Sequence, residues 1–168
     1  FIIVFDIYWL IKTVYLSLHL SQSFKKMRCY IKIDWLDKLE KLPAASYQLP
    51  ATKSWRELYH LIILPRYKEE YEVVKVTLEG LSNSTYPKNK MIVVLAQEGR
   101  AGEEINQTGK LLEQEYSQKF FKFLVTEHPA DWPGELAGKG ANAAFAAEQA
   151  KNLVIDSLGL SYAKVLVS

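Results

Sequence analysis

The fold class is decided by the stretch from residue 59 to residue 96, YHLIILPRYKEEYEVVKVTLEGLSNSTYPKNKMIVVLA. It begins and ends with short runs of Val, Ile and Leu, which are typical of strands buried in the centre of a sheet. Between these runs the apolar residues repeat with a helical period, and acidic residues favour the helix start. The face predicted to turn inward carries Val73, Val74, Thr77, Leu78 and Leu81. A strand, a helix and a second strand in this order predict a βαβ unit with parallel strands.

The same alternation continues to Ser168. We predict a helix from Glu103 to Tyr116, a strand FFKFLV at residues 120–125, a helix from Gly140 to Gly159 and a strand YAKVLV at residues 162–167. The side chains expected to face inward on the first of these helices are Ile105, Leu111 and Leu112. The fold expected for this part is therefore α/β, with a mostly parallel, Rossmann-like sheet.

A sheet of this kind binds ligands at the carboxyl ends of its strands, beside the point where the strand order reverses. We therefore expect residues 65–70, 96–100 and 127–142 to meet there. His128 and Asp131 lie three residues apart in the last segment. Because a third ligand is missing, we interpret both as ordinary polar loop residues.

The first twenty residues, FIIVFDIYWLIKTVYLSLHL, include 15 apolar ones. About 20 such residues are needed to span a bilayer core, so this run predicts a transmembrane helix. Asp6 must then face another helix or lie near an interface, because a charge at mid-bilayer costs about 3 kcal/mol. A buried or interfacial helix of a soluble protein is the alternative.

Lys25, Lys26, Arg28 and Lys32 follow this run, and no acidic residue intervenes before Asp34. By the positive-inside rule, this flank and the chain after it are expected on the cytoplasmic side of the cell membrane. The expected division is a transmembrane helix at 1–22, a basic juxtamembrane or interfacial helix and linker at 23–54, and an α/β domain at 55–168. A core-packed amphipathic helix is an equally good interpretation of residues 35–42.

The composition adds two limits. A net charge of +2 gives no global reason to expect a nucleic-acid partner. The one cysteine, Cys29, can form neither an intramolecular disulfide nor a zinc site by itself.

Phe1 at the start and a strand-like end at Ser168 are interpreted as signs of a fragment.

Two motifs resemble those of family 2 glycosyltransferases, which have the GT-A fold. Residues 64–69, LPRYKE, are similar to the Pro-x-Tyr-Asn-Glu element at the end of that family's first strand, where the chain meets the nucleotide. Residues 138–142, GKGAN, are similar to its Gly-Lys-x-x-Asn element. The resemblance extends from about Leu61 to Ser168 and implies the nucleotide-binding half of a GT-A domain behind a membrane anchor.

The resemblance implies a nucleotide-sugar site. In it, Tyr67 packs against a base or ribose, Glu69 accepts hydrogen bonds from the ribose or base, and Lys139 neutralises a diphosphate. The implied nucleotide-sugar ligands in this chain are Pro65, Tyr67, Glu69, Gln97, Glu98, Lys139 and Asn142. Two departures leave selectivity for uridine open: Lys68 stands where the family has Asn, and the second strand ends Ala96-Gln97-Glu98 in place of an Asp.

The implied activity is inverting transfer of a sugar, from a donor expected to be a UDP-sugar, to a glycan or lipid acceptor, as in polysaccharide biosynthesis. The family's Asp-x-Asp element and catalytic base are expected beyond Ser168, so no metal ligand or catalytic residue is assigned within the chain. A divalent cation, Mg or Mn, is expected only in the complete protein. The fragment alone is therefore expected to be inactive.

Two other interpretations remain open. One is a membrane-tethered α/β binding or regulatory module without catalysis, which the departures at Lys68 and Gln97 favour. The other is a soluble nucleotide-binding enzyme of the Rossmann type. The latter is disfavoured because residues 65–70, PRYKEE, contain no Gly-x-Gly-x-x-Gly after the first strand.

Overall fold

The computed structural model describes residues 2–41, 54–130, 132–135 and 138–168. The chain divides into two compact units, Phe1–Lys41 and Leu42–Ser168, which are described separately. The linker predicted around residues 43–50 lies outside the described residues.

The first unit is dominated by a single long helix, α1 (Ile2–Tyr30), none of whose residues is buried. Among the described residues, this helix alone is long and apolar enough to cross a membrane. It does not end near residue 22 but continues through Lys25, Lys26 and Arg28. A short helix, α2 (Trp35–Glu40), follows, and the Asp34 side chain caps its start by accepting hydrogen bonds from the Leu36 and Asp37 backbone N–H groups.

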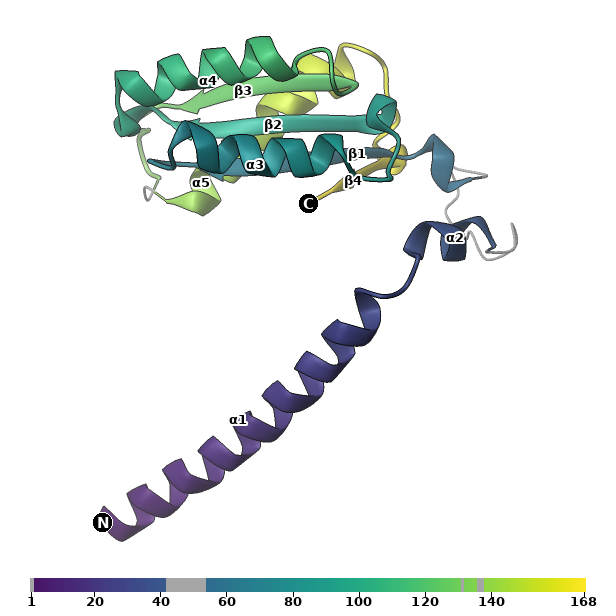
Figure 1. Cartoon of the computed structure of the whole chain (residues 1–168). Coiled ribbons are helices and arrows are strands. Elements are labelled where there is room, and N and C mark those ends of the chain that lie inside the picture. The colour runs from purple at the N-terminus through teal and green to yellow at the C-terminus, as the bar shows by residue number, and fades with distance from the viewer. Residues whose placement is uncertain (1, 42–53, 131, 136–137) are drawn as a thin grey trace. The chain divides into compact units, whose positions relative to one another are not determined.

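The second unit is built on a four-stranded parallel sheet with strand order β3-β2-β1-β4 (Figure 1). The strands are β1 (Tyr59–Arg66), β2 (Met91–Glu98), β3 (Lys122–His128) and β4 (Val165–Val167). The central strands β1 and β2 contain the predicted runs. The predicted third strand is displaced: β3 begins at Lys122 and extends to His128.

The predicted fourth strand is shorter than expected. Its first three residues form a 3-10 turn, η6 (Tyr162–Lys164), and only Val165–Val167 pair with β1. The Ile63 N–H donates to the Ser168 carbonyl oxygen and the Ser168 N–H donates to the Leu61 carbonyl oxygen. The next backbone nitrogen of β1 on the side of β4 belongs to Pro65, which has no proton to donate. Pro65 is paired with Ala96 in the β1–β2 register, so the proline does not interrupt that ladder.

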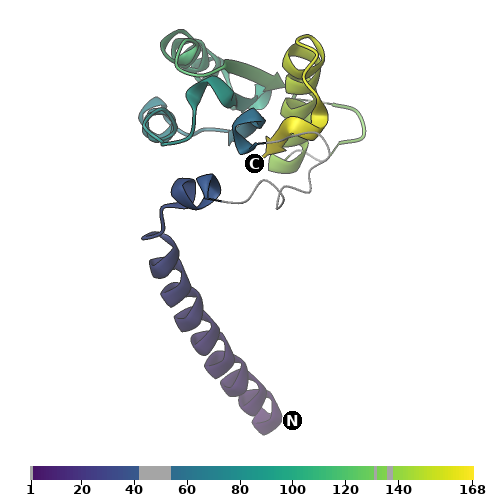
Figure 2. The same cartoon turned by 90° about the vertical axis from the view of Figure 1, so that its right-hand side faces the viewer.

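Helices cover both faces of the sheet. Helices α3 (Tyr71–Ser82) and α4 (Glu103–Tyr116) lie on one face, and α5 (Lys139–Ala150) lies on the other (Figure 2). A π-helical turn, η5 (Lys151–Asp156), extends α5, and Gly159 ends the segment with a φ of 62°. Three further 3-10 turns, η2 (Trp55–Glu57), η3 (Lys88–Lys90) and η4 (Gly99–Ala101), lie in the connections.

Alternation along β2 supplies a core to each face, because successive side chains of a strand point to opposite sides. Met91, Val93 and Leu95 pack beneath α3 and α4, whereas Ile92 and Val94 pack beneath α5. Every residue of β2 is buried. This alternation also decides which way the polar residues at the strand ends point.

Three predicted inward positions, Val73, Thr77 and Leu111, are wrong, because all three are exposed. Val73 is 57% exposed and Leu111 is 55% exposed, whereas Val74 and Leu112 are buried. The buried stripe on each helix is narrow and repeats every four residues, at Val74 and Leu78 on α3 and at Leu112 and Tyr116 on α4. Residues 73 and 111 lie about 100° further round their helices, outside that stripe. Ile105 is half-buried.

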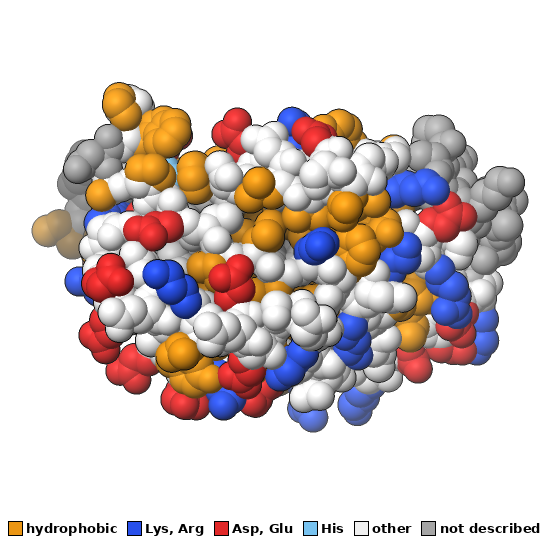
Figure 3. Space-filling view, turned by 90° about the horizontal axis from the view of Figure 1, so that it is seen from above, with side chains coloured by type: hydrophobic (Ala, Val, Ile, Leu, Met, Phe, Trp, Pro, Cys, Tyr) orange, Lys and Arg blue, Asp and Glu red, His pale blue; other side chains and the backbone are white. Residues whose placement is uncertain are grey.

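The face seen from above in Figure 3 carries acidic and basic side chains interspersed with one another, and hydrophobic side chains gather in a band between them. The β3 edge of the sheet lies on this upper side in Figure 1. An edge strand offers unpaired backbone groups, and lysine on such a strand discourages pairing with another chain. Lys122, exposed at the start of β3, fits that role.

Candidate functional site

The carboxyl ends of three strands are aligned by the sheet register. Arg66 of β1 is paired in register with Gln97 of β2, and Glu98 of β2 is paired with His128 of β3. Within the sheet, β2 and β3 lie to one side of β1, whereas β4, the last strand in the chain, lies to its other side. The strand order therefore reverses at β1. The carboxyl end of β1 is therefore the point where ligands bind in sheets of this type.

Arg66, which the sequence did not single out, is the anchor of this edge. It shares the α3/α4 face with Ile62 and Leu64, and it is only 2% exposed. Its Nε donates to the Glu69 carbonyl oxygen at 2.9 Å, Nη1 donates to the Ile105 carbonyl oxygen at 3.2 Å, and Nη2 donates to Thr108 Oγ1 at 2.8 Å. Burial lowers the pKa of the guanidinium, and the Glu69 carboxylate opposes that shift. The side chain ties the turn after β1 to α4.

Glu69 lies at the centre of the turn after β1. Its Oε2 accepts a hydrogen bond from the Tyr67 backbone N–H at 2.6 Å. This bond is the main cause that holds the pKa of Glu69 below its ordinary value, and the charge of Lys139 contributes in the same direction. Glu69 is thus bonded to the Tyr67 backbone and is influenced by the charge of Lys139, which lies 70 residues further along the chain.

The Tyr67 ring is contacted by two cations. Lys68 Nζ lies 5.2 Å from the ring centroid, and the Arg100 guanidinium carbon lies 5.1 Å from it. Tyr67 is 37% exposed. Arg100 Nε in turn donates to Glu98 Oε2 at 3.0 Å, and the Glu98 side chain is only 6% exposed. A chain of contacts therefore runs from the buried Glu98 carboxylate through Arg100 to the Tyr67 ring.

The Gln97 side chain is buried and hydrogen-bonded within the protein. Its Nε2 donates to the Ile105 carbonyl oxygen at 2.8 Å, and the side chain is buried beneath Gly109 of α4. A Cβ built on Gly109 would lie 2.4 Å from Gln97 Oε1, so glycine is what lets the amide fit there. Of the two polar residues at the end of β2, Glu98 is the one linked to the Tyr67 ring, through Arg100.

Asn142 and Lys139 have different surroundings although they share the first turn of α5. Asn142 is 1% exposed, and its Nδ2 donates to the Ala96 carbonyl oxygen at 2.8 Å, which fixes α5 against β2. Lys139, the first residue of α5, is exposed. No described side chain caps this helix start, so its backbone N–H groups and Lys139 present positive charge at the sheet edge.

His128 is not an irregular loop residue, as the sequence indicated, but the last residue of β3. It is 5% exposed, its Nε2 lies 2.9 Å from Glu135 Oε2, and its ring packs edge-on against Phe145 at 5.2 Å. Asp131 lies outside the described residues. Side chains alternate along β3, and this places His128 on the α5 face. The sequence would have predicted this position had the strand been extended to residue 128.

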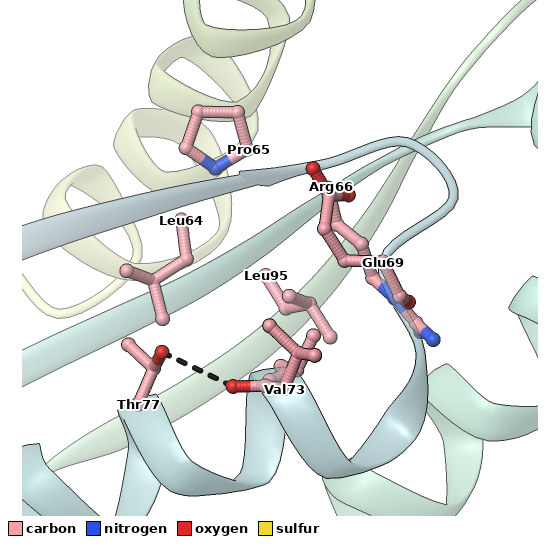
Figure 4. A pocket seen from close by; sticks show the side chains of 8 residues that line it. Leu64, Pro65, Arg66, Glu69, Val73, Thr77 and Leu95 are labelled. Atoms are coloured by element: carbon pink, nitrogen blue, oxygen red, sulfur yellow. Dashed lines mark hydrogen bonds between the residues drawn. The ribbon is translucent and has the colours of Figure 1, made fainter.

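Two hollows adjoin these residues. The smaller, of about 150 Å³, lies between β1 and α3, where Leu64 and Thr77 face each other (Figure 4). The larger, of about 530 Å³, lies between the starts of α3 and α4 and has Arg66 at its base. Its lining mixes acidic and basic groups: Arg66, Lys68, Glu70, Tyr71, Glu72, Ala101, Glu104, Ile105 and Thr108.

Metal-binding side chains do not cluster here: the residues the structure describes contain no group of three or more His, Cys, Asp or Glu able to hold an ion. Comparisons of the chain with protein-family models, with curated proteins and with solved structures gave no match. The function is therefore inferred from the geometry of this edge and from the two motifs.

Proposed function

We propose that this chain is the donor-binding part of a membrane-anchored family 2 glycosyltransferase, with its α/β unit a half GT-A domain on the cytoplasmic side. In this proposal the site at the carboxyl end of β1 binds a nucleotide-sugar, expected to be a UDP-sugar. The acceptor is a glycan or a lipid.

One observation supports the proposal above the others. Tyr67, Glu69 and Lys139 come from the two motifs that carry the resemblance; Glu69 is bonded to Tyr67 at the carboxyl end of β1 and is influenced by the charge of Lys139. An aromatic face, a carboxylate that stays ionised and a cation at a helix start are the three groups that a base, a ribose and a diphosphate require. Asn142 fixes α5, which carries Lys139, against β2.

The base contact falls to Glu98 in this proposal, because Gln97 is bonded to α4. Glu98 is paired with Arg100, whose guanidinium also lies over the Tyr67 ring. A base that stacks on Tyr67 must therefore displace Arg100 from the ring, and the same movement exposes the Glu98 carboxylate to the base edge. Arg100 then lies beside the bound nucleotide, where its charge can reach a phosphate.

The expected Mg or Mn ion does not fit the residues present. The described part of the chain holds no set of metal ligands. The buried carboxylate at the end of β2, Glu98, is paired with Arg100. We therefore derive no step through a cation and assign no catalytic base. The role proposed for these residues is to bind and orient the donor.

The membrane part of the proposal rests on α1, which exposes its apolar side chains over its whole length. The basic residues Lys25, Lys26 and Arg28 at its end favour a cytoplasmic position for the chain that follows. An acceptor that is itself a lipid, or a glycan built on one, is reached from that position.

The test is a calorimetric titration of the whole chain in detergent with UDP, GDP and ADP, with and without manganese. We expect UDP to bind, and we expect Tyr67→Ala and Lys139→Ala each to weaken binding at least fivefold. Tyr67→Phe keeps the ring and Lys110→Ala removes an exposed lysine from α4, so both should bind as the parent does. Equal loss in Lys110→Ala, or no binding of any nucleotide, would contradict the proposal.

A second function, a membrane-tethered binding or regulatory module, is favoured by one observation. The residues at the end of β2 are both engaged within the protein, Gln97 with α4 and Glu98 with Arg100. The absence of nucleotide binding in the titration above, with the chain folded, is the result that this alternative predicts.

A further inference from the structure

The helix α1 is longer than a bilayer core requires. Its 29 residues extend about 43 Å at 1.5 Å per residue, whereas the hydrocarbon core is about 30 Å thick. The apolar run ends at Leu20, so the last ten residues of the helix lie beyond it. If the apolar run occupies the core, these last turns lie among the lipid headgroups.

The charge of this segment has one sign. Between Asp6 and Asp34 the chain contains no acidic residue, and Lys25, Lys26, Arg28 and Lys32 fall within the last part of that interval. After it, the Asp37 carboxylate is paired with Lys41 at 2.7 Å, and Asp34 accepts the two N–H groups at the start of α2. Asp37 is thus paired with a lysine outside the four basic side chains, and Asp34 caps α2.

The chain turns sharply after α1, and the turn is held by Trp35. The indole Nε1 donates to the Tyr30 carbonyl oxygen at 3.1 Å, which satisfies an acceptor at the end of the helix. The Tyr30 and Trp35 rings pack edge-on with centroids 5.7 Å apart, and Lys38 Nζ lies 5.2 Å from the Trp35 ring centroid. We call residues 21–41 the elbow.

The elbow bears a shallow depression of about 530 Å³ that is widely open to its surroundings. Its lining combines an ammonium and a hydroxyl with apolar and aromatic surface: Ser23, Lys26, Met27, Tyr30, Ile31 and Trp35. Met27, Ile31 and Trp35 are about half exposed or more, and nothing within this unit covers them. Trp and Tyr at such a position are typical of the membrane–water interface, where one end of the ring is apolar and the other is wet.

We propose that the elbow is a binding site for an anionic phospholipid of the bilayer. The phosphate lies against Lys26 and Ser23, and the glycerol and first acyl carbons lie against Met27, Ile31 and Trp35. Lys25, Arg28 and Lys32 add attraction to the same leaflet. This lipid site depends on membrane insertion of α1 and not on the donor site, so it can be present or absent independently of sugar transfer.

The experiment measures phospholipid retained by the whole chain. The protein is purified in detergent with phosphatidylcholine and phosphatidylglycerol in equal amounts, and the lipid that remains bound is identified by native mass spectrometry. We expect phosphatidylglycerol to be retained in preference. Lys26→Gln should reduce its retention about fivefold, the equivalent of the ~1 kcal/mol that one basic residue contributes near an anionic surface.

The controls separate the elbow from general charge and from folding. The triple variant Lys75→Gln, Lys110→Gln, Lys119→Gln removes more charge from the α/β unit and should retain phosphatidylglycerol as the parent does. Trp35→Phe keeps a ring but loses the indole N–H, and it should reduce retention while the helical circular dichroism and the UDP titration stay unchanged. Equal retention of the two lipids, equal loss in the triple variant, or displacement by equimolar inorganic phosphate would overturn the proposal.

Discussion

Arg66 and Gln97 donate hydrogen bonds to one acceptor, the Ile105 carbonyl oxygen, at 3.2 and 2.8 Å. The two residues are partners in the β1–β2 register, and both are 2% exposed. They join the carboxyl ends of two strands to the first turn of α4. The edge that carries Tyr67 and Glu69 is therefore supported from beneath by buried polar contacts.

This relationship predicts a cost for Arg66→Lys. The substitution keeps the charge but loses the planar guanidinium that reaches Glu69, Ile105 and Thr108 at once, so buried acceptors lose their donors. We expect the free energy of unfolding to fall by about 2 kcal/mol. Urea unfolding followed by circular dichroism measures it, and a change smaller than that of the exposed control Lys110→Arg would contradict the role given to Arg66.

Two glycines in helices predict opposite effects of alanine. At Gly109 a Cβ would lie 2.4 Å from Gln97 Oε1 and 2.7 Å from Nε2, and we expect Gly109→Ala to destabilise by about 1–3 kcal/mol. At Gly80 of α3 nothing lies within 4 Å, and we expect Gly80→Ala to stabilise by about 1 kcal/mol. Thermal unfolding of both variants makes the comparison, which fails if the two shifts have the same sign.

His60 predicts a dependence of stability on pH. Its Nε2 lies 2.8 Å from Ser168 Oγ where β1 pairs with β4, and burial lowers its pKa from 6.5. Because the folded pKa lies below the unfolded one, the unfolded chain takes up the proton first as the pH falls. The contribution to stability is present above pH 6.5 and is lost as the pH falls through the folded pKa.

We therefore expect the melting temperature to fall from pH 7.5 to pH 5, and to fall less in His60→Gln. Parallel curves for parent and variant would show that another group causes the dependence.

Arg100 gives a prediction that belongs to the proposed donor site. Arg100→Gln removes the cation over the Tyr67 ring and releases Glu98. If a base stacks on that ring, uridine without phosphates should bind about two- to fivefold more tightly, because a cation–π contact of about 0.5–1 kcal/mol no longer has to be broken. UDP should gain less, since Arg100 also attracts phosphate. Calorimetry with uridine and UDP separates the two effects, and weaker uridine binding would refute this arrangement.

The sequence by itself determined the α/β class, the positions of β1 and β2, and the bounds of α4. Val, Ile and Leu in short runs identify buried strands wherever they pack, and residues 103–116 have a helical period between breakers. The sequence also predicted the long apolar helix α1, because the ability to span a bilayer is judged from length and composition alone. Each of these features depends on the residue types and their spacing within one short segment of the chain.

Only the tertiary structure decided which polar side chains are free. Gln97 and Glu98 are neighbours in sequence, yet alternation sends one beneath α4 and the other toward Arg100. Arg66 occupies the unspecified position of the Pro-x-Tyr element, and its side chain bonds to the carbonyl oxygen of Ile105, 39 residues away. The same holds for Val73 and Leu111, whose exposure follows from how narrow a stripe each helix presents to the sheet. Such contacts join distant segments, so no local pattern contains them.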